Sequence, residues 1–480
     1  MNAYLTAEGW EPGVLNALNS FIEQHGGNSD GAESSYAVFD FDNSSSVFDT
    51  ADQLAVFQLM HMAFAVAPEK LNELLPIDDL SFWEDLSDYG YPGVCLQNWV
   101  TDVCRAYRVL YEHYGPFSAE GLPEETAHAV QKDPFWMEFA VKMRAMYDLI
   151  CRVVPYEKAD SWINNWFYGM TAPEVYLLSR RSCETYCNLE TERVTWKSDP
   201  KIPSVVGAVS FSWVSGLSVT SNIRELMQVL RKNGIDVWVC SGSFADTIRA
   251  AVDVLGIHDS VTGLLGMVHC RDAHGKYTQN YDYATGTGWI SVPGGGWKED
   301  NLPMKARPHR EGKTDAISNT LLKKYGHGPN LGFMDSSGDF YFCTEFSSME
   351  LVVCINRADR SIRNGGGLIA ALALYQRDCL HFDYRTAKNI NETLYVLQGR
   401  DENGLRTLRS SNASIPLGAK EEQLFQSEEN HRLLELLKRQ NLSTGEIIQT
   451  YSVKTSAADE RNPLGLAYGF LTDFRGYRHY

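Results

Sequence analysis

Short apolar runs that end in polar or glycine-containing turns recur along the chain. They are YAVFDFD at 36–42, IDVWVCSGS at 235–243, NLGFMDSSGD at 330–339 and MELVVCINR at 349–357. Runs of this length without polar alternation are typical of strands that are buried on both faces of a parallel sheet. The pattern therefore predicts the α/β class, with a doubly wound (Rossmann-like) parallel sheet that helices cover on both faces.

Helical spacing dominates the long stretch between the first and second of these strands. About two hundred residues separate them, and the clearest amphipathic segments lie at 52–66, 96–115, 133–154 and 171–186. A connection of this length is itself a domain. We predict an N-terminal helix and first strand in residues 1–45, a mainly helical cap domain in 46–215, the rest of the sheet domain in 216–375 and a C-terminal extension in 376–480.

Several shorter patterns complete the expected elements. Helices that end at glycine are predicted at 222–234 and 313–326, and further helices at 365–378 and 421–440. Hairpins are predicted at 263–282, around a DAHGK turn, and at 392–411. The glycine-rich segment at 286–299 lacks a strand-then-helix context, so we interpret it as a loop. No chemistry is predicted for the last hundred or so residues.

Composition narrows the class of ligand. The chain has 480 residues, 44% of them hydrophobic, and a formal net charge of −18, which argues against nucleic acid or an anionic membrane as the partner. No apolar run approaches the roughly 18 residues that a membrane helix needs, and the first residues do not resemble a signal peptide. A soluble, cytoplasmic protein with a small-molecule ligand is expected, or a periplasmic or secreted one if a leader precedes the sequence.

The ten cysteines are scattered and show no paired CxxC spacing of a zinc site. We interpret them as reduced thiols, with Cys183 and Cys187 as the pair most suited to a disulfide.

Candidate chemistry lies at the ends of the predicted strands. Ligands of open parallel sheets bind beyond the carboxyl ends of the strands. Asp40 and Asp42 follow the first strand, and Ser241 and Gly242 the second. The third strand is followed by two further acids, and the helix before it begins with a lysine; these residues are Asp335, Asp339 and Lys313.

These groups fit the needs of phosphoryl transfer. Side chains alternate along a strand, so Asp40 and Asp42 leave one face, where one can attack phosphorus and the other can serve as acid and then base. Mg²⁺ prefers oxygen ligands, which Asp40, the Asp42 carbonyl and Asp335 would supply. Asp339 is either another metal ligand or the group that orients a lysine. The phosphoryl oxygens would contact Ser241, the Gly242 amide and Lys313.

The order of these motifs resembles the haloacid dehalogenase superfamily of hydrolases. DFDNS at 40–44 resembles its first motif, VWVCSGS its second, GKTDAI its lysine motif and DSSGD its last acidic motif. Two positions depart from the family pattern, since Ser44 stands for threonine and Met334 for glycine. The resemblance implies a Mg²⁺-dependent phosphatase that forms an aspartyl-phosphate, because dehalogenase members lack the second acid found here as Asp42.

Four segments are most similar to the phosphorylcholine phosphatase branch: DFDNSS at 40–45, WINNWFYGMTAPEV at 162–175, NIRELMQVLRKNGIDVWVCSGS at 222–243 and EGKTDAI at 311–317. The helical insert resembles that of the phosphoserine phosphatase type. The first resemblance implies a cationic substrate that aromatic rings and carboxylates would hold. Candidate groups for it are Phe48, Asp52, Trp162, Trp166 and Tyr168, although aromatic residues at helical spacing also suit a core. Alternatives are a phosphatase for phosphoserine or a sugar phosphate, and a non-catalytic binding protein. His309, with Arg307 and Arg310, is interpreted as part of a solvated charged loop, and contact with an anionic substrate is the alternative.

Overall fold

The computed structural model describes residues 4–27, 34–75, 79–159, 161–187, 189–358, 365–404 and 406–452. The described chain divides into two compact units. A sheet unit contains residues up to 49, 217–268 and 282 onward, and a helical unit contains 50–216 and 269–281.

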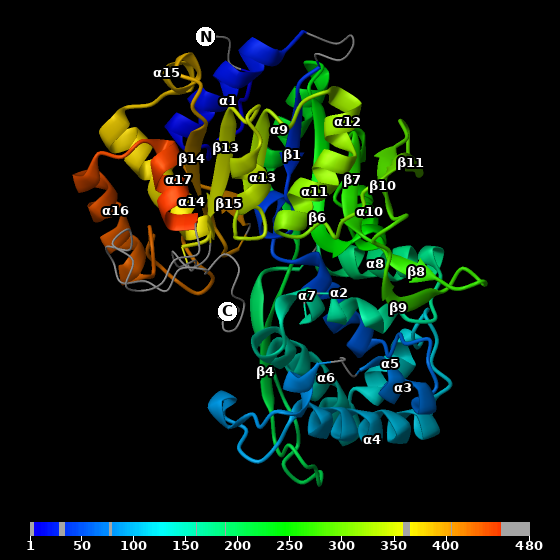
Figure 1. Ribbon diagram of the computed structural model, residues 1–480. Helices are drawn as coiled ribbons and strands as arrows, with labels where there is room; N and C mark the ends of the chain where they lie inside the picture. Colours follow the sequence, from blue (N-terminus) through cyan, green and yellow to red (C-terminus); the bar gives the residue numbers. More distant parts are fainter. Residues whose placement is uncertain are drawn as a thin grey trace. The chain divides into compact units, whose positions relative to one another are not determined.

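A nine-stranded sheet forms the centre of the sheet unit (Figure 1). Its strand order is β11-β10-β7-β6-β1-β12-β13-β14-β15. The strands from β7 to β14 in this order are parallel, whereas β10, β11 and β15 are antiparallel additions at the edges. The strands are β1 (Tyr36–Phe39), β6 (Asp236–Phe244), β7 (Gly263–Met267), β10 (Thr287–Ser291), β11 (Trp297–Pro303), β12 (Leu331–Met334), β13 (Leu351–Asn356), β14 (Leu394–Asp401) and β15 (Thr407–Leu408).

The parallel strands follow the order of a doubly wound sheet. From β1 the chain adds β6 and β7 on one side, then returns to add β12, β13 and β14 on the other. This confirms the predicted fold class. The direction of winding reverses between β1 and β12, and such a reversal leaves space for a ligand beyond the carboxyl ends of the two strands.

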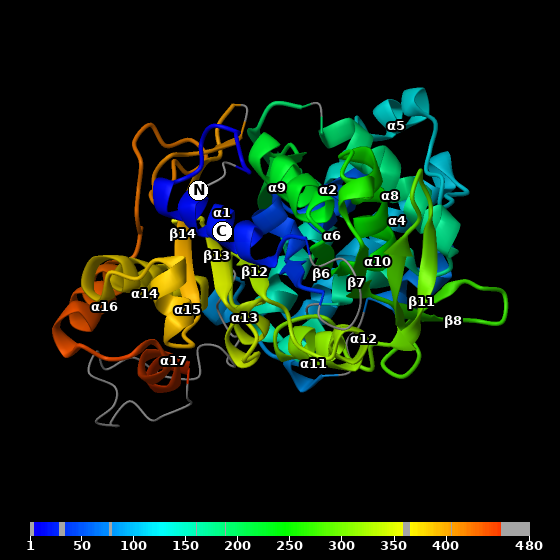
Figure 2. The ribbon, with the colours of Figure 1, turned by 90° about the horizontal axis from the view of Figure 1, so that it is seen from above.

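Helices cover both faces of this sheet. In Figure 2, α9 and α10 lie on one side of the strands, and α11, α12 and α13 lie on the other. All four residues of β1 are buried, and Phe39 stacks on Phe333 of β12 with ring centroids 4.3 Å apart. The helices are α1 (Pro12–His25), α9 (Ser221–Lys232), α10 (Ala245–Val254), α11 (Glu311–Asn319), α12 (Leu321–Tyr325), α13 (Phe340–Glu345), α14 (Gly365–Tyr375), α15 (Tyr384–Asn389), α16 (Glu428–Gln440) and α17 (Thr444–Ser452).

The helical unit packs around α4 and α6. Lys142 of α6 is fully buried and donates to the Asp102 carboxylate of α4 at 3.0 Å and also to Glu138, so the buried charge is compensated. Its helices are α2 (Thr50–Met60), α3 (Pro68–Leu74), α4 (Leu96–Tyr114), α5 (Glu124–Val130), α6 (Pro134–Val153), α7 (Tyr156–Ala159) and α8 (Ala172–Tyr186). Two hairpins accompany them, β3 (Glu192–Lys197) with β4 (Ser210–Ser215), and β8 (His269–Arg271) with β9 (Tyr277–Tyr281).

Two regions differ from the sequence interpretation. The glycine-rich segment is not a loop, because β10 and β11 pair across it and three glycines with positive φ, Gly294, Gly295 and Gly296, form the turn. The predicted hairpin at 392–411 forms as β14 and β15, but β14 also joins the main sheet beside β13. Part of the predicted C-terminal extension is therefore integral to the sheet.

The ten cysteines are all free thiols, so the suggested disulfide between Cys183 and Cys187 is wrong. Both cysteines lie one turn apart at the end of α8. Within the described part of the chain, no helix has the length and apolar character needed to cross a membrane.

Candidate active site

Lys313 joins the first and last acidic motifs at the reversal point of the sheet. Asp40 follows β1, and its amide donates to the Phe333 carbonyl of β12 at 3.1 Å, which keeps it within the sheet edge. The Lys313 Nζ atom lies 2.7 Å from Asp40 Oδ1 and 2.6 Å from Asp339 Oδ1. All three side chains are buried. The structure thus brings together three of the residues that the strand-end argument selected.

Asp335 completes an acidic cluster at this position. Among the described residues, Asp40, Asp335 and Asp339 can place carboxylate oxygens within 4.8 Å of one another. The Asp335 amide faces Asp339 Oδ2 at 3.4 Å, and the Asp335 carboxylate accepts from Arg357 Nη1 at 3.2 Å. Asp339 therefore contacts both Lys313 and the Asp335 backbone, an arrangement that suits an orienting group.

The electrostatics of the cluster reflect its surplus of negative charge. Burial raises the pKa of the Asp40 carboxyl well above its ordinary value, and the Asp339 charge raises it further, while Lys313 opposes both. Burial also raises the pKa of Asp339. Burial alone would lower the pKa of Lys313, but Asp339 and Asp40 outweigh it and raise that pKa, so the ammonium is charged. A cation next to these carboxylates would favour their ionised forms.

Asp42 points to a pair of serines. Beyond Asp40 the chain makes one wide helical turn, η1 (Phe41–Ser45), in which Asn43 has a left-handed φ of 67°. The Asp42 carboxylate accepts a hydrogen bond from Ser243 Oγ at 2.6 Å and a longer contact from Ser241 Oγ at 3.4 Å. The described carboxylates that could hold a metal ion together are those of Asp40, Asp335 and Asp339, a group that does not include Asp42.

The segment before α11 is not the solvated charged loop that the sequence suggested. Arg310 is 2% exposed, and its amide donates to the Gly338 carbonyl at 3.1 Å. His309 packs against Gly242, where a Cβ atom would lie only 2.6 Å from its ring. Arg310 is buried because this segment closes against the turn that contains Asp339, while Arg307 and His309 are half-buried.

The candidate substrate-binding residues fall into both units. Phe48 belongs to the sheet unit, is buried, and its carbonyl accepts from the Asn43 amide at 3.3 Å. Asp52 belongs to the helical unit, where its carboxylate pairs with Arg144 at 2.6 Å.

The three aromatic candidates belong to the helical unit. Trp162 is buried and donates to the Leu75 carbonyl at 2.7 Å, and its ring lies edge-on to the buried Trp166. Tyr168 is half-buried. The two tryptophans belong to the core of this unit because both side chains are buried in it, although only the indole N–H of Trp162 has a hydrogen-bond partner there.

Three polar residues at the site were missed by the sequence argument. Ser243 could have been found, because it lies two positions after Ser241 in the same strand-end motif, and both hydroxyls contact Asp42 Oδ2. Arg357 directly follows the fourth apolar run, which was the one strand end to which no role was given. Arg400 comes from the C-terminal segment, where no pattern in the sequence connects it with residues of the first strand.

Comparisons with known proteins add information on the fold. No protein-family model and no curated protein matches the chain. Among solved structures, a protein of unknown function from Anaerococcus prevotii is 24% identical with a TM-score of 0.65, over 86% of this chain and 99% of that one.

Two further structures have much lower TM-scores. A phosphoserine phosphohydrolase-like protein from Francisella tularensis has a TM-score of 0.26 at 11% identity, over 67% of this chain and 88% of its own. Cytosolic 5′-nucleotidase IIIB bound to cytidine has a TM-score of 0.28 at 11% identity, over 73% and 81%. The fold and site define a doubly wound α/β protein with a buried lysine and acidic cluster at its reversal point, and the first of these similarities supports that fold.

Proposed function

We propose that this protein is a Mg²⁺-dependent phosphomonoesterase of the haloacid dehalogenase type. One observation carries the proposal: a buried lysine bridges the acid that follows β1 and an acid beyond β12, while a second acid, Asp42, follows two residues later beside two serine hydroxyls. These are the groups that an aspartyl-phosphate mechanism requires, and they converge at the point of the fold where ligands bind.

The residues fit a magnesium ion. Among the described ion pairs, three carboxylates, Asp40, Asp335 and Asp339, face two cations, Lys313 and Arg357. Carboxylate and carbonyl oxygens are the donors that Mg²⁺ prefers. We propose Asp40, Asp335 and the Asp42 carbonyl as its ligands, with Asp339 holding Lys313. When bound, the ion would neutralise charge on the phosphoryl oxygens.

Asp40 would begin the reaction as the nucleophile. Its carboxylate oxygen attacks phosphorus, the bond from phosphorus to the leaving oxygen breaks, and Asp42 gives a proton to that oxygen. Lys313 supplies positive charge beside Asp40. The hydroxyl of Ser241 and the amide of Gly242 are proposed to bind phosphoryl oxygens.

Asp42 would complete the cycle as a base. A water molecule attacks the aspartyl-phosphate and transfers a proton to Asp42, while the bond from phosphorus to Asp40 breaks and inorganic phosphate leaves. Asp42 is then protonated again and ready for the next turnover. Ser243 holds its carboxylate in one orientation, which both proton transfers need.

The proposed substrate class is a small cationic phosphomonoester such as phosphorylcholine. Sequence resemblance supports it, whereas the pairing of Asp52 with Arg144 and the burial of Trp162 and Trp166 remove three of the groups expected to bind a cation. Phe48 and Tyr168 stay as candidates. The rival class is a non-cationic phosphomonoester such as phosphoserine or a sugar phosphate.

Phosphate release from a panel of substrates tests both the phosphatase activity and the proposed substrate class. The full-length protein would be assayed with phosphorylcholine, phosphoserine, a sugar phosphate and p-nitrophenyl phosphate, with Mg²⁺ and with a chelator. We expect Mg²⁺-dependent release of inorganic phosphate and the highest kcat/KM for phosphorylcholine. A higher kcat/KM for the non-cationic esters would reject the cationic class, and no release from any ester would reject the phosphatase.

A further inference from the structure

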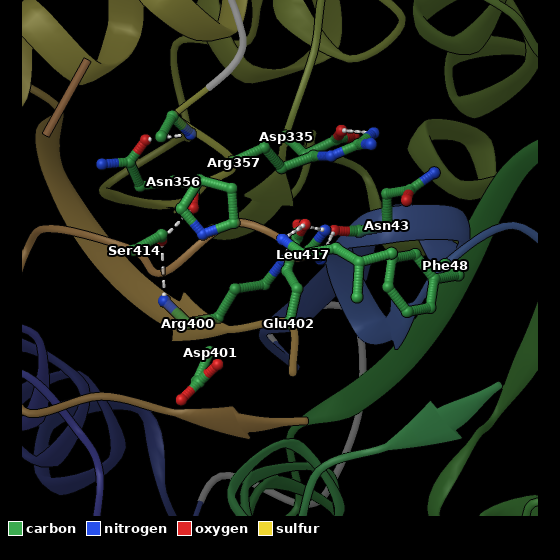
Figure 3. A network of polar contacts seen from close by, with 12 residues as sticks. Asn43, Phe48, Asp335, Asn356, Arg357, Arg400, Asp401, Glu402, Ser414 and Leu417 are labelled. Atoms are coloured by element: carbon green, nitrogen blue, oxygen red, sulfur yellow. Dashed lines mark hydrogen bonds and ion pairs between the residues drawn. The ribbon is translucent and has the colours of Figure 1, made fainter. Parts of the chain in front are cut away.

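A buried arginine from the C-terminal part of the chain contacts the turn that carries Asp42. Arg400 of β14 is 1% exposed, and its Nη1 atom donates to the Asn43 carbonyl at 2.6 Å (Figure 3). Its Nε and Nη2 atoms donate to Glu402 Oε1 at 3.0 and 2.6 Å. The guanidinium therefore has a fixed orientation, with one arm on Glu402 and the other on the turn.

The position of Asn43 gives this contact its significance. Asn43 directly follows Asp42 and has a left-handed φ of 67°, a conformation that costs free energy for a residue other than glycine. The amide of the same residue donates to the Phe48 carbonyl at 3.3 Å. The peptide groups on both sides of Asn43 are thus held, and they determine where the Asp42 side chain leaves the backbone.

Glu402 and Ser414 hold the arginine in turn. The second carboxylate oxygen of Glu402 accepts from the Leu417 amide at 3.2 Å. The Arg400 amide donates to Ser414 Oγ at 2.8 Å, and that hydroxyl donates to the carbonyl of Asn356.

This network ends next to the acidic cluster. The residue after Asn356 is Arg357, whose Nη1 atom donates to Asp335 at 3.2 Å. Figure 3 shows the chain of contacts from Asn43 through Arg400 and Ser414 to Arg357 and Asp335. Residues of β14 and of the segment that follows it therefore contact two places at the site. One is the turn that contains Asp42, and the other is the end of β13, next to Arg357, the partner of Asp335.

Packing alone does not explain why a charged pair, Arg400 and Glu402, is buried beside the turn that contains Asp42. Removing a guanidinium from water is unfavourable, and apolar side chains of similar volume often fill such a site at least as well. The geometry points instead to a directional role, since a planar guanidinium can hold a carbonyl and a carboxylate at a fixed angle.

We propose that Arg400, oriented by Glu402, is a positioning residue that holds Asp42 in place for proton transfer. The role rests on the proposed function, because it concerns the acid and base of that reaction. Misplacing a catalytic group by about 1 Å can cost roughly a hundredfold in rate. The C-terminal segment would therefore belong to the catalytic core although it contributes no group that touches the substrate.

Two substrates with different leaving groups separate positioning of Asp42 from general damage. Departure of p-nitrophenol needs little help from an acid, whereas departure of an alkoxide from phosphorylcholine or another alkyl phosphate depends on it. In an Arg400→Met/Glu402→Gln double variant, which avoids an unpaired buried charge, we expect kcat for the alkyl phosphate to fall by roughly 10- to 100-fold with little change in KM.

Rapid mixing with p-nitrophenyl phosphate provides the second measurement. The double variant is expected to release a first equivalent of p-nitrophenol at nearly the wild-type rate and then turn over slowly, because hydrolysis of the aspartyl-phosphate still needs Asp42 as base. An Arg400→Lys variant should recover part of the loss. Leu433→Ala, a substitution in the buried face of α16, is the control for lowered stability, and it should leave the ratio of the two substrates unchanged.

The possible outcomes are distinct. An active wild-type protein combined with a p-nitrophenol burst rate that falls as much as kcat for the alkyl phosphate, or with no loss in the double variant, would overturn the role of Arg400 and leave the phosphatase proposal standing. If the wild-type protein released no phosphate from any ester, the proposed function would fail and this role would fail with it.

Discussion

Single residues at the site depend on one another for charge compensation. Lys313 is the main example, because its ammonium lies in the interior of the sheet unit and is held there by Asp40 and Asp339. Taking Lys313 away leaves two buried carboxylates without their common cation. Such groups affect stability as well as chemistry, and the two effects can be measured separately.

Lys313→Met is expected to lower the free energy of unfolding by about 3 to 5 kcal/mol, because the buried carboxylates lose their common partner. Urea unfolding followed by tryptophan fluorescence gives this value. Lys323→Met, at an exposed position of α12, is the control and should change stability by less than about 0.5 kcal/mol. Equal midpoints for the two variants would contradict the assigned role of Lys313 in charge compensation.

Asp40→Asn is expected to abolish turnover and leave the protein folded, since the amide keeps the shape of the side chain but is not a nucleophile. Phosphate release and far-UV circular dichroism measure the two properties. Retention of wild-type turnover by this variant would show that Asp40 is not the nucleophile.

Ser243→Ala is expected to lower kcat by about tenfold with little effect on KM, because the Asp42 carboxylate loses its shorter hydrogen bond. Steady-state kinetics with an alkyl phosphate provides the measurement. Ser348→Ala removes a comparable half-buried hydroxyl that bonds the Pro329 carbonyl, and it should have no such effect. If both variants kept the wild-type kcat, Ser243 would have no part in orienting Asp42.

Much of the residue arrangement could be predicted from the sequence. The rule that ligands bind at strand ends placed Asp40 and Asp335 at one edge, and the structure brings their carboxylates together; their chemical roles stay predictions. Arg400 could not be found in this way, because its contact with Asn43 joins residues more than three hundred positions apart and depends on the register of β14. The burial of Arg310 could not be predicted either, since a run of charged residues normally indicates a segment that is exposed to solvent.

At the scale of elements, the beginning of α11 sets the position of Lys313. Gly312 lies in the first turn of this helix, and a Cβ atom there would come within 1.8 Å of the Arg307 carbonyl oxygen. The Gly312 amide also donates to the His309 carbonyl at 3.0 Å. The segment from 307 to 312 is therefore closed so tightly that only glycine fits.

Gly312→Ala is expected to destabilise the protein by about 1 to 3 kcal/mol or more and to reduce activity, because the helix must shift and carry Lys313 with it. Thermal unfolding and phosphate release are the measurements. Gly445→Ala in α17 is the control, since no atom lies within 4 Å of its Cβ position and alanine favours a helix. A melting temperature of the Gly312 variant at or above that of the control would disprove the close contact.

Element prediction succeeded where periodicity was strong and failed where edge strands were concerned. The buried runs that became β1, β6, β12 and β13 could be recognised from their apolar residues alone. In contrast, β10 and β11 mix polar and apolar residues, because they lie at the edge of the sheet and flank a turn of three glycines. The composition there resembles that of a loop, and the strands are defined by the pairing of β10 with β7 and of β11 with β10.

At the scale of the whole molecule, the two units carry different acid-sensitive groups. In the sheet unit, burial of Glu350 is outweighed by hydrogen bonds from His25, Lys388 and Tyr384, which lower its pKa to about 2. In the helical unit, burial lowers the pKa of His269 to about 4. Glu350 therefore loses its stabilising effect only below about pH 4.5, whereas His269 becomes unfavourable already below about pH 6.5.

Acidification from pH 6.5 to 4 is expected to destabilise the helical unit by up to about 3 kcal/mol, because the unfolded chain binds a proton at His269 that the folded unit excludes. Urea midpoints measured across this range should fall with pH in the wild-type protein and fall less in His269→Gln. His274→Gln, at an exposed position of the same hairpin, should follow the wild type. Parallel profiles for all three proteins would exclude His269 as the sensitive group.

The position of β1 in the middle of the sheet has a consequence for synthesis on the ribosome. Tyr36 pairs with Asp236 on one side, and Ala37 pairs with Leu331 on the other, so both neighbours of this strand are made long after it. At about 5 to 20 residues per second, the nearer neighbour follows after roughly 10 to 40 s. During this time residues 50–216 of the helical unit can fold, while the entirely apolar β1 has no neighbouring strand to pair with. We therefore expect the nascent chain, more than the finished protein, to depend on chaperones.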